Sequence, residues 1–267
     1  MTYRNEPWTL ERDDYNPQQV RALMAKTSVT VIIPARNEAA TLGAVLDAVR
    51  QSPVPVDELL VVNDHSSDHT SAVAHRHGAQ VVEMVGPSGK GEAMRAGLEA
   101  SCAEIIVFLD ADVVNTTSDF VARLIQPLLL RNDIQLVKGF YERPLHDKPT
   151  GGGRVNELTA RPILSLLYPS LAAIRQPLAG ETAGRRSAFN AVTLQSTYGV
   201  EIALLIDIER RFGVTSIAQA DLGVRSHRNR PLHELGPMAI DVLRAALVRY
   251  GVTLPTDSLA MKGDIGS

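Results

Sequence analysis

The feature that most limits the possible folds is an apolar run that ends in two carboxylates. Ile105 to Leu109 form this run, and Asp110-Ala111-Asp112 follows directly. The run is too short for an amphipathic helix, so it predicts a strand buried on both faces, as in a parallel sheet covered by helices. Open sheets of this kind bind ligands at the carboxyl ends of their strands. Two acids there suit a divalent cation that bridges to a phosphate, and the plainer alternative is a turn or a helix N-cap.

Apolar runs alternate with helical patterns along most of the chain. Leu42, Val45, Leu46 and Val49 have the spacing of a helix packed on a sheet. Strands are expected at 28–33 (stopping at Pro34), 57–62, 79–85, 105–109, 134–141 and 216–220. Helices are expected up to Gly78, through Ala100, at 118–130, 155–167 and 198–212, and from Pro237 onward. This alternation predicts a doubly wound α/β fold with a mainly parallel sheet.

Composition excludes several classes of protein. The chain has 267 residues, 45% hydrophobic, and a formal net charge of −3, which gives no general attraction to nucleic acid. Its apolar runs fall short of the ~20 residues of a membrane span. Cys102 is the only cysteine, and its place before a strand predicts a small core residue. Residues 1–26 lack the apolar core of a signal peptide, so a cytoplasmic location is expected.

Two glycine-rich loops contain a basic residue that could meet an anion. Gly86 to Gly91 includes Lys90, but its spacing does not match the P-loop of nucleotide hydrolases. Lys90 at the start of a helix is a suitable phosphate contact, or else a solvated surface lysine. The expected loop Pro144 to Gly153 ends in three glycines followed by Arg154, which could clamp a phosphate or carboxylate, although the glycines could also form a hinge.

Later in the chain, Glu201 lies in the first turn of an expected helix, where an acid need do no more than oppose the helix dipole. The segment from Arg225 to Arg230 is the densest polar cluster, with three arginines, one histidine and one asparagine within six residues.

Nine segments together resemble a known family. The nucleotide-sugar-binding half of GT-A glycosyltransferases is similar to Pro34-Ala35-Arg36-Asn37-Glu38, Asn63-Asp64-His65-Ser66-Ser67-Asp68, Gly89-Lys90-Gly91 and Asp110-Ala111-Asp112. The retaining glucosyl-3-phosphoglycerate synthases of actinobacteria are similar, more specifically, to Gln135-Leu136-Val137-Lys138, Gly151 to Val155, Gln176 to Glu181, Tyr198 to Ile202 and His227 to Leu232. The resemblance runs from about Ser28 to about Tyr250 and implies glucose transfer from UDP-glucose to 3-phosphoglycerate.

The resemblance also implies roles for individual residues. Nucleotide-sugar contacts would come from Pro34, Arg36, Glu38, Asp64, Lys90, Asp110, Ala111, Leu178, Tyr198 and Arg230. Acceptor contacts would come from Gly153, Arg154, Asn156 and Asn229. Mg²⁺ or Mn²⁺ would be held by Asp112 and His227 with the donor diphosphate. The catalytic set would be Glu201, Asp112 and Arg225, with Glu201 holding sugar hydroxyls rather than acting as a nucleophile.

The same resemblance divides the chain into an N-terminal extension at 1–27, a nucleotide-sugar-binding half at 28–141, an acceptor-binding and metal-completing half at 142–250, and a tail at 251–267. It also suggests a homodimer. Three departures from the family pattern are expected on the acceptor side: a shortened loop at 146–150, Asn156 in place of a hydroxyl residue, and a basic stretch, Thr182 to Arg186.

Other functions remain open at this point. The nearest is a mannosyl version that uses GDP-mannose, because neither the sugar nor the base is legible from the residues. An inverting family-2 glycosyltransferase would need a general base beside the acceptor. A sugar-phosphate nucleotidyltransferase is disfavoured because Pro34 to Glu38 replaces its glycine-rich basic loop. A non-catalytic nucleotide-sugar sensor would need neither a metal set nor an acceptor clamp.

Overall fold

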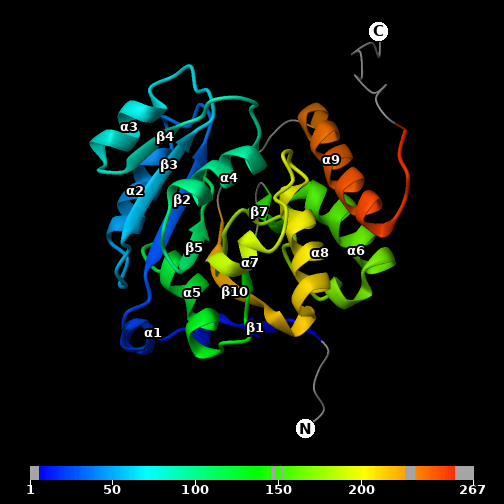
Figure 1. Cartoon of the computed structure of the whole chain (residues 1–267), viewed down its shortest axis with the longest axis horizontal. Coiled ribbons are helices and arrows are strands. Elements are labelled where there is room, and N and C mark those ends of the chain that lie inside the picture. The colour runs from blue at the N-terminus through cyan, green and yellow to red at the C-terminus, as the bar shows by residue number, and fades with distance from the viewer. Residues whose placement is uncertain (1–5, 143, 146–147, 152, 226–231, 256–267) are drawn as a thin grey trace.

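The computed structural model describes residues 6–142, 144–145, 148–151, 153–225 and 232–255, and it is built on one eight-stranded sheet (Figure 1). In their order across the sheet, the strands are β1 (Trp8–Leu10), β10 (Ile217–Val224), β6 (Leu136–Glu142), β9 (Thr182–Arg185), β5 (Ile105–Phe108), β2 (Val29–Ala35), β3 (Glu58–Asn63) and β4 (Gln80–Glu83). β9 is antiparallel to both neighbours, and the other pairs are parallel. The expected α/β fold with a mainly parallel sheet is confirmed.

Helices cover both faces of this sheet. One face packs against α1 (Pro17–Met24), α2 (Leu42–Arg50), α3 (Thr70–Arg76) and α5 (Phe120–Leu130). The other face packs against α4 (Lys90–Ala100), α6 (Arg161–Leu167), α7 (Arg186–Asn190), α8 (Val200–Phe212) and α9 (Leu232–Tyr250). β5 supplies Ile105 and Val107 to the first core and Ile106 and Phe108 to the second, so it is buried on both faces as predicted.

The amino-terminal residues are part of the sheet, which the sequence did not indicate. β1 pairs with β10, and α1 packs on α5 (Figure 1). Trp8 is also covered by the Arg131 guanidinium, 5.4 Å from the centre of its ring. β1 is therefore the short edge strand on this side of the sheet, and it pairs backbone groups of β10 that would otherwise be exposed.

Three local expectations were wrong. β2 continues through Pro34 to Ala35. The carbonyl of Ile32 accepts a hydrogen bond from the Leu109 N–H, so the backbone groups of Pro34, two residues later, also face the side of β5. Because β5 has ended at that point, no acceptor is left there for an N–H, and a proline is tolerated. Pro237 lies inside α9 rather than at its start. Its lost hydrogen bond is offset because one face of the following turns, with Val242, Ala245 and Ala246, is buried. Cys102 is exposed, since it lies in the connection before β5 rather than in the core.

Three short strands were missed as well. The segment expected as a loop before Gly153 contains a hairpin, β7 (Pro144–Leu145) and β8 (Lys148–Gly151). β9 was not expected at all, although it lies in the middle of the sheet. Among the described residues, no helix is both long and apolar enough to cross a membrane.

Candidate active site

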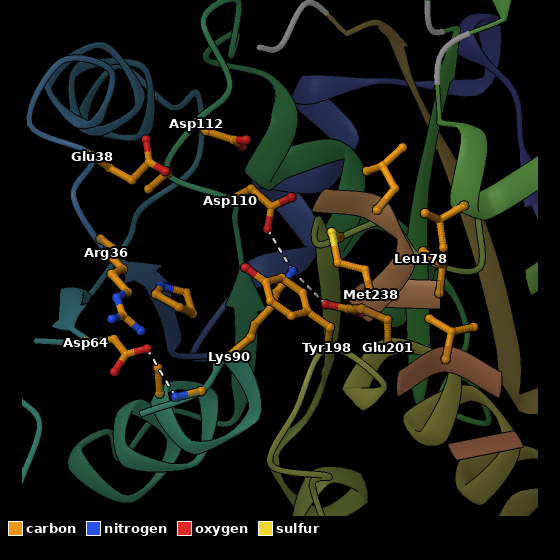
Figure 2. Close-up of a pocket in the computed structure, with 18 of the residues that line it drawn as sticks. Arg36, Glu38, Asp64, Lys90, Asp110, Asp112, Leu178, Tyr198, Glu201 and Met238 are labelled. Carbon is orange, nitrogen blue, oxygen red and sulfur yellow. Dashed lines mark hydrogen bonds and ion pairs between the residues drawn. The ribbon is translucent and has the colours of Figure 1, made fainter. Parts of the chain in front are cut away.

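A cavity of about 540 Å³ opens at the carboxyl ends of β2, β3 and β5. Every predicted site residue that the structure describes lines it, namely Pro34, Arg36, Glu38, Asp64, Lys90, Asp110, Ala111, Asp112, Gly153, Arg154, Asn156, Leu178, Tyr198, Glu201 and Arg225. Three others, His227, Asn229 and Arg230, lie outside the described residues. Figure 2 shows Arg36 and Asp64 on one side of the cavity and Leu178 and Met238 on the other, with Lys90 between them.

Asp64 directly follows β3, and its two carboxylate oxygens have different surroundings. Its Oδ2 accepts hydrogen bonds from the Ser88 hydroxyl at 2.9 Å and from the Gly89 N–H at 3.1 Å. Its Oδ1 is buried and has no hydrogen-bond partner among the described residues. A buried carboxylate oxygen without a partner is costly, so this position suits a ligand that brings an N–H donor. Arg36 donates to the same Ser88 hydroxyl at 2.7 Å and rigidifies this end.

Lys90 is the first residue of α4 and reaches into the centre of the cavity. Its Nζ is 2.9 Å from Oδ1 of Asp110 and 3.1 Å from Oε1 of Glu201 (Figure 2). Burial alone would lower the pKa of Lys90, but the charges of these two carboxylates outweigh it and raise the pKa above its ordinary value. Lys90 is therefore a permanent cation at the centre of the site, rather than the solvated surface lysine that the sequence also allowed.

Gly91 is what lets the start of α4 approach the segment before α8. A Cβ atom at this position would lie 1.6 Å from the carbonyl oxygen of Gln195. The Gly91 N–H donates to the carbonyl of Ser196 at 3.2 Å. This close backbone contact holds the start of α4, with Lys90, against the segment before α8, with Tyr198. Both residues line the cavity, although they lie far apart in the sequence.

Arg225 joins the two acids that follow β5. Its Nη2 is 2.9 Å from Oδ2 of Asp110 and 3.1 Å from Oδ1 of Asp112. Its Nη1 donates to the Tyr141 hydroxyl at 2.6 Å and to Oε2 of Glu181 at 3.2 Å. Burial would raise the pKa of Asp110, but the charges of Lys90 and Arg225 outweigh it and hold the pKa well below its ordinary value.

The two acids therefore have different surroundings. Both oxygens of Asp110 are engaged by cationic side chains, whereas the described donor to Asp112, Arg225, contacts only Oδ1. This difference supports the prediction that Asp112 rather than Asp110 is the metal ligand. The described residues contain no group of three or more His, Cys, Asp or Glu side chains that could hold a metal ion. The predicted contact between Asp112 and His227 falls outside the described residues.

Glu201 is buried under the cavity and does more than oppose a helix dipole. Its Oε1 faces Lys90, and its Oε2 is 2.6 Å from Nζ of Lys138, a residue of β6. No role was expected from the sequence for Lys138, Glu181 or Tyr141. One sequence signal pointed to this network: Lys138 is a charged residue inside the strand expected at 134–141. A charged side chain in a buried strand needs a partner of opposite charge.

On the acceptor side, Gly153 has a φ of +74°, in the left-handed region that favours glycine. Asn156 is buried, and its side chain is taken up by protein groups. It accepts from the Leu178 N–H at 3.4 Å and donates to Oε1 of Glu157 at 2.9 Å and to the Arg175 carbonyl at 3.4 Å. Asn156 thus ties the acceptor side to the turn that carries Leu178, while its contact with the acceptor itself stays a prediction.

In the basic stretch Thr182 to Arg186, the two arginines do not lie on the predicted acceptor side. β9 is antiparallel to its neighbours, so its last residues lie at the amino ends of the parallel strands. The cavity lies at the carboxyl ends, at the opposite end of the sheet. Arg185 donates to the carbonyl of Ile134, and Arg186 to the carbonyl of Ala103, at 3.0 and 2.9 Å. These arginines cap backbone carbonyls.

Comparison with known proteins shows what this arrangement belongs to. Residues 30–178 match the model of glycosyl transferase family 2. The chain is 43% identical to a glucosyl-3-phosphoglycerate synthase of Mycobacterium tuberculosis (strain CDC 1551 / Oshkosh), over 91% of this chain and 80% of the relative. It is 41% identical to that of Petrotoga mobilis, over 83% of this chain and 73% of the relative.

Solved structures agree. The crystal structure of the Mycobacterium tuberculosis synthase with Mn²⁺, UDP-glucose and phosphoglyceric acid is 41% identical, with a TM-score of 0.85, and covers 93% of this chain and 88% of that chain. The complex with Mn²⁺, UDP and glucosyl-3-phosphoglycerate also has a TM-score of 0.85, and covers 92% of this chain and 88% of that chain. The chain described here therefore belongs to the glucosyl-3-phosphoglycerate synthase family, within glycosyl transferase family 2.

Proposed function

We propose that this protein is a divalent-metal-dependent hexosyltransferase that moves glucose from UDP-glucose to 3-phosphoglycerate, giving glucosyl-3-phosphoglycerate with retention of configuration. The observation that carries the proposal is that one cavity gathers every described residue predicted for donor, metal and acceptor. This cavity lies in a fold that the chain shares with the Mycobacterium tuberculosis synthase, whose crystal structure contains Mn²⁺, UDP-glucose and phosphoglyceric acid.

The nucleotide belongs at the end of the cavity formed by Arg36 and Asp64. Oδ1 of Asp64 lacks a hydrogen-bond donor among the described residues, and the imide N–H of uracil supplies one. Lys90 lies between this end and the sugar, where its charge suits the diphosphate or ribose oxygens. The negative donor is thus met by a fixed cation in the middle of the site.

The chemistry of Asp112 fits Mg²⁺ or Mn²⁺, because a carboxylate at the cavity wall is an oxygen ligand that both ions accept. Since the described residues offer no third acidic or histidine partner, the remaining ligands would be donor phosphate oxygens and His227. A metal bound there supplies charge stabilisation for the departing UDP. Arg225 holds Asp112 in place and keeps Asp110 ionised beside it.

The acceptor belongs beside Gly153 and Arg154. Both line the cavity, and a guanidinium next to backbone N–H groups suits the phosphate and carboxylate of 3-phosphoglycerate. Glu201 is a poor nucleophile because both of its oxygens are paired with ammonium groups. This supports a role in holding sugar hydroxyls, with the leaving phosphate oxygen assisting deprotonation of the acceptor.

One assay matrix tests the proposal. UDP-glucose, GDP-glucose and GDP-mannose are each combined with 3-phosphoglycerate or glycerate, with and without Mg²⁺, and the release of nucleoside diphosphate and the anomeric configuration of the product are measured. Retained glucosyl-3-phosphoglycerate from UDP-glucose is expected. Preference for GDP-mannose would favour the mannosyl version. A product of inverted configuration would favour the inverting alternative, and donor hydrolysis without transfer would refute the acceptor site.

Three further expectations are part of the proposal. The division of residues 28–250 into donor and acceptor halves follows the lining of the cavity, to which both halves contribute. A homodimer would use the exposed apolar side chains near the end of α9, such as Val248 and Tyr250. A cytoplasmic location suits the exposed, unpaired Cys102.

A further inference from the structure

Lys138 is a buried lysine below the floor of the active site. It lies on β6 with 1% of its side chain exposed, and it does not line the cavity. Burying an ammonium group is expensive unless every proton finds an acceptor. Lys138 meets this condition through the carbonyl of Ala179, the hydroxyl of Thr182 at 2.8 Å and Oε2 of Glu201 at 2.6 Å.

These three acceptors hold Lys138 at a fixed point. Ala179 and Thr182 flank the start of β9, which pairs with β6 beside Lys138. Two of the three bonds therefore tie Nζ to the sheet, and only the third reaches α8. The lysine consequently acts as an anchor from which the carboxylate of Glu201 is held.

Glu201 in turn lies between two ammonium groups on opposite sides. Oε2 is bound from below by Lys138, and Oε1 faces Lys90 at the cavity wall, 3.1 Å away. Lys90 continues the chain of charges to Asp110. Without Lys138, Oε2 would be a buried carboxylate oxygen without its cation, and the carboxylate would be drawn toward Lys90.

We infer that Lys138 is a positioning residue, which sets the orientation of the Glu201 carboxylate toward the transferred sugar without touching a substrate. The kinetic part of the inference rests on the proposed function, because it takes Glu201 as the contact to the sugar. The geometric part, that Lys138 fixes Glu201, does not depend on the identity of the substrate.

Burial and charge are consistent with this role. Burial lowers the pKa of Lys138, and the charge of Glu201 opposes that effect only in part. The ion pair with Glu201 therefore offsets part of the cost of burying this ammonium group. Neutralising both members together should be tolerated better than removing the lysine alone, because no uncompensated charge then stays buried.

A double-mutant cycle tests the kinetic part. Lys138→Met, Glu201→Gln and the double variant are compared with wild type by steady-state kinetics for UDP-glucose and 3-phosphoglycerate. Lys138→Met is expected to lower kcat by about 10- to 100-fold, with a smaller change in KM for the nucleotide sugar. The double variant should be no more than about twofold slower than Glu201→Gln alone. If the fold-losses in kcat of the two single variants multiplied in the double variant, the inference would be refuted. Lys138 would then affect turnover independently of Glu201.

Two controls separate positioning from folding. Arg186→Met removes a partly buried cation that donates to backbone carbonyls at the opposite end of the sheet from the cavity. This variant should therefore have a lower melting temperature and an unchanged kcat. Lys138→Arg, which keeps the charge, should recover part of the kcat lost in Lys138→Met. If Lys138→Met lowered only the melting temperature, as Arg186→Met does, the lysine would be structural and the inference wrong.

A crystal structure of Lys138→Met tests the geometric part without any substrate. The Glu201 carboxylate is expected to leave its place above β6 and turn toward Lys90, and an unmoved carboxylate would contradict the inference. If Glu201 moves but wild type transfers no glucose from UDP-glucose, the proposed function fails while the anchoring role of Lys138 stands.

Discussion

Gly180 lies directly against the carboxylate of Asp110. A Cβ atom at residue 180 would be 1.9 Å from Oδ1 and 2.5 Å from Oδ2 of that acid. Asp110 cannot easily move away, since Lys90 and Arg225 hold one oxygen each. The turn before β9 therefore sets the position of an acid seventy residues earlier in the sequence.

Gly180→Ala is accordingly expected to displace Asp110 and reduce kcat/KM for UDP-glucose by about 10- to 100-fold, because small misplacements in a site are costly. Steady-state kinetics measures the effect. Gly236→Ala is the matched control: apart from its chain neighbours, a Cβ there meets nothing within 4 Å, so this change in α9 should leave kcat/KM near the wild-type value. No gain in stability is expected, because Pro237 follows and disfavours a Cβ on the helical residue before it. Equal activity of the two variants would contradict the expected displacement.

Asp64→Asn tests the nucleotide end of the cavity. Replacing one carboxylate oxygen with an NH₂ group removes the charge and acceptor capacity, so UDP should bind about 10- to 100-fold more weakly, the equivalent of about 1.5–3 kcal/mol for a hydrogen bond to a charged group. Calorimetric titration with UDP measures this. The exposed Glu99→Gln serves as the control, and unchanged UDP affinity in Asp64→Asn would show that the base lies elsewhere.

Asp112→Ala tests the metal assignment. Turnover should fall by at least about 100-fold, and more Mg²⁺ should be needed for half-maximal rate, because a metal ligand is lost. Activity measured against Mg²⁺ concentration gives both values. Asp133→Ala removes an acid whose partner is Arg131 at the surface, and should leave both unchanged. An Asp112→Ala enzyme with the Mg²⁺ dependence of wild type would refute the assignment.

Acid should weaken the network around Asp110. Since the folded-state pKa of this acid lies below its ordinary value of 3.8, an unfolded chain takes up the proton first as pH falls. The stabilisation is fully present above the ordinary pKa and is lost progressively at lower pH. The difference in free energy of unfolding between wild type and Asp110→Asn should therefore shrink below about pH 4. Urea unfolding across this range measures it, and a constant difference would count against the ion pairs.

Arg186→Met examines the reassigned basic stretch. Loss of its hydrogen bonds to the carbonyls of Leu98 and Ala103 should cost about 1–3 kcal/mol of unfolding free energy. Because Arg186 lies at the opposite end of the sheet from the cavity, KM for 3-phosphoglycerate should not change. A raised KM would return this stretch to the acceptor site.

Much of the fold was legible in the sequence because burial on both faces leaves a simple pattern. The run at Ile105 to Leu109 predicted a central strand, and alternation with helices predicted a mainly parallel sheet. β9 was not legible, because Thr182-Ala183-Gly184-Arg185 has neither an apolar run nor β-branched enrichment. Its neighbours β5 and β6 make it a strand by supplying backbone partners on both sides.

The site divides in the same way. Local sequence determined the residues that carry chemistry at the ends of elements, such as Asp64 after β3, Lys90 at the start of α4 and the acids after β5, because strand ends and helix starts place polar groups in predictable positions. Only the tertiary structure decided how they are paired. Lys138 meets Glu201 and Gly180 meets Asp110 across long stretches of sequence. Such contacts follow from the order of strands in the sheet and from the packing of α8 on it, which no local pattern of residues encodes.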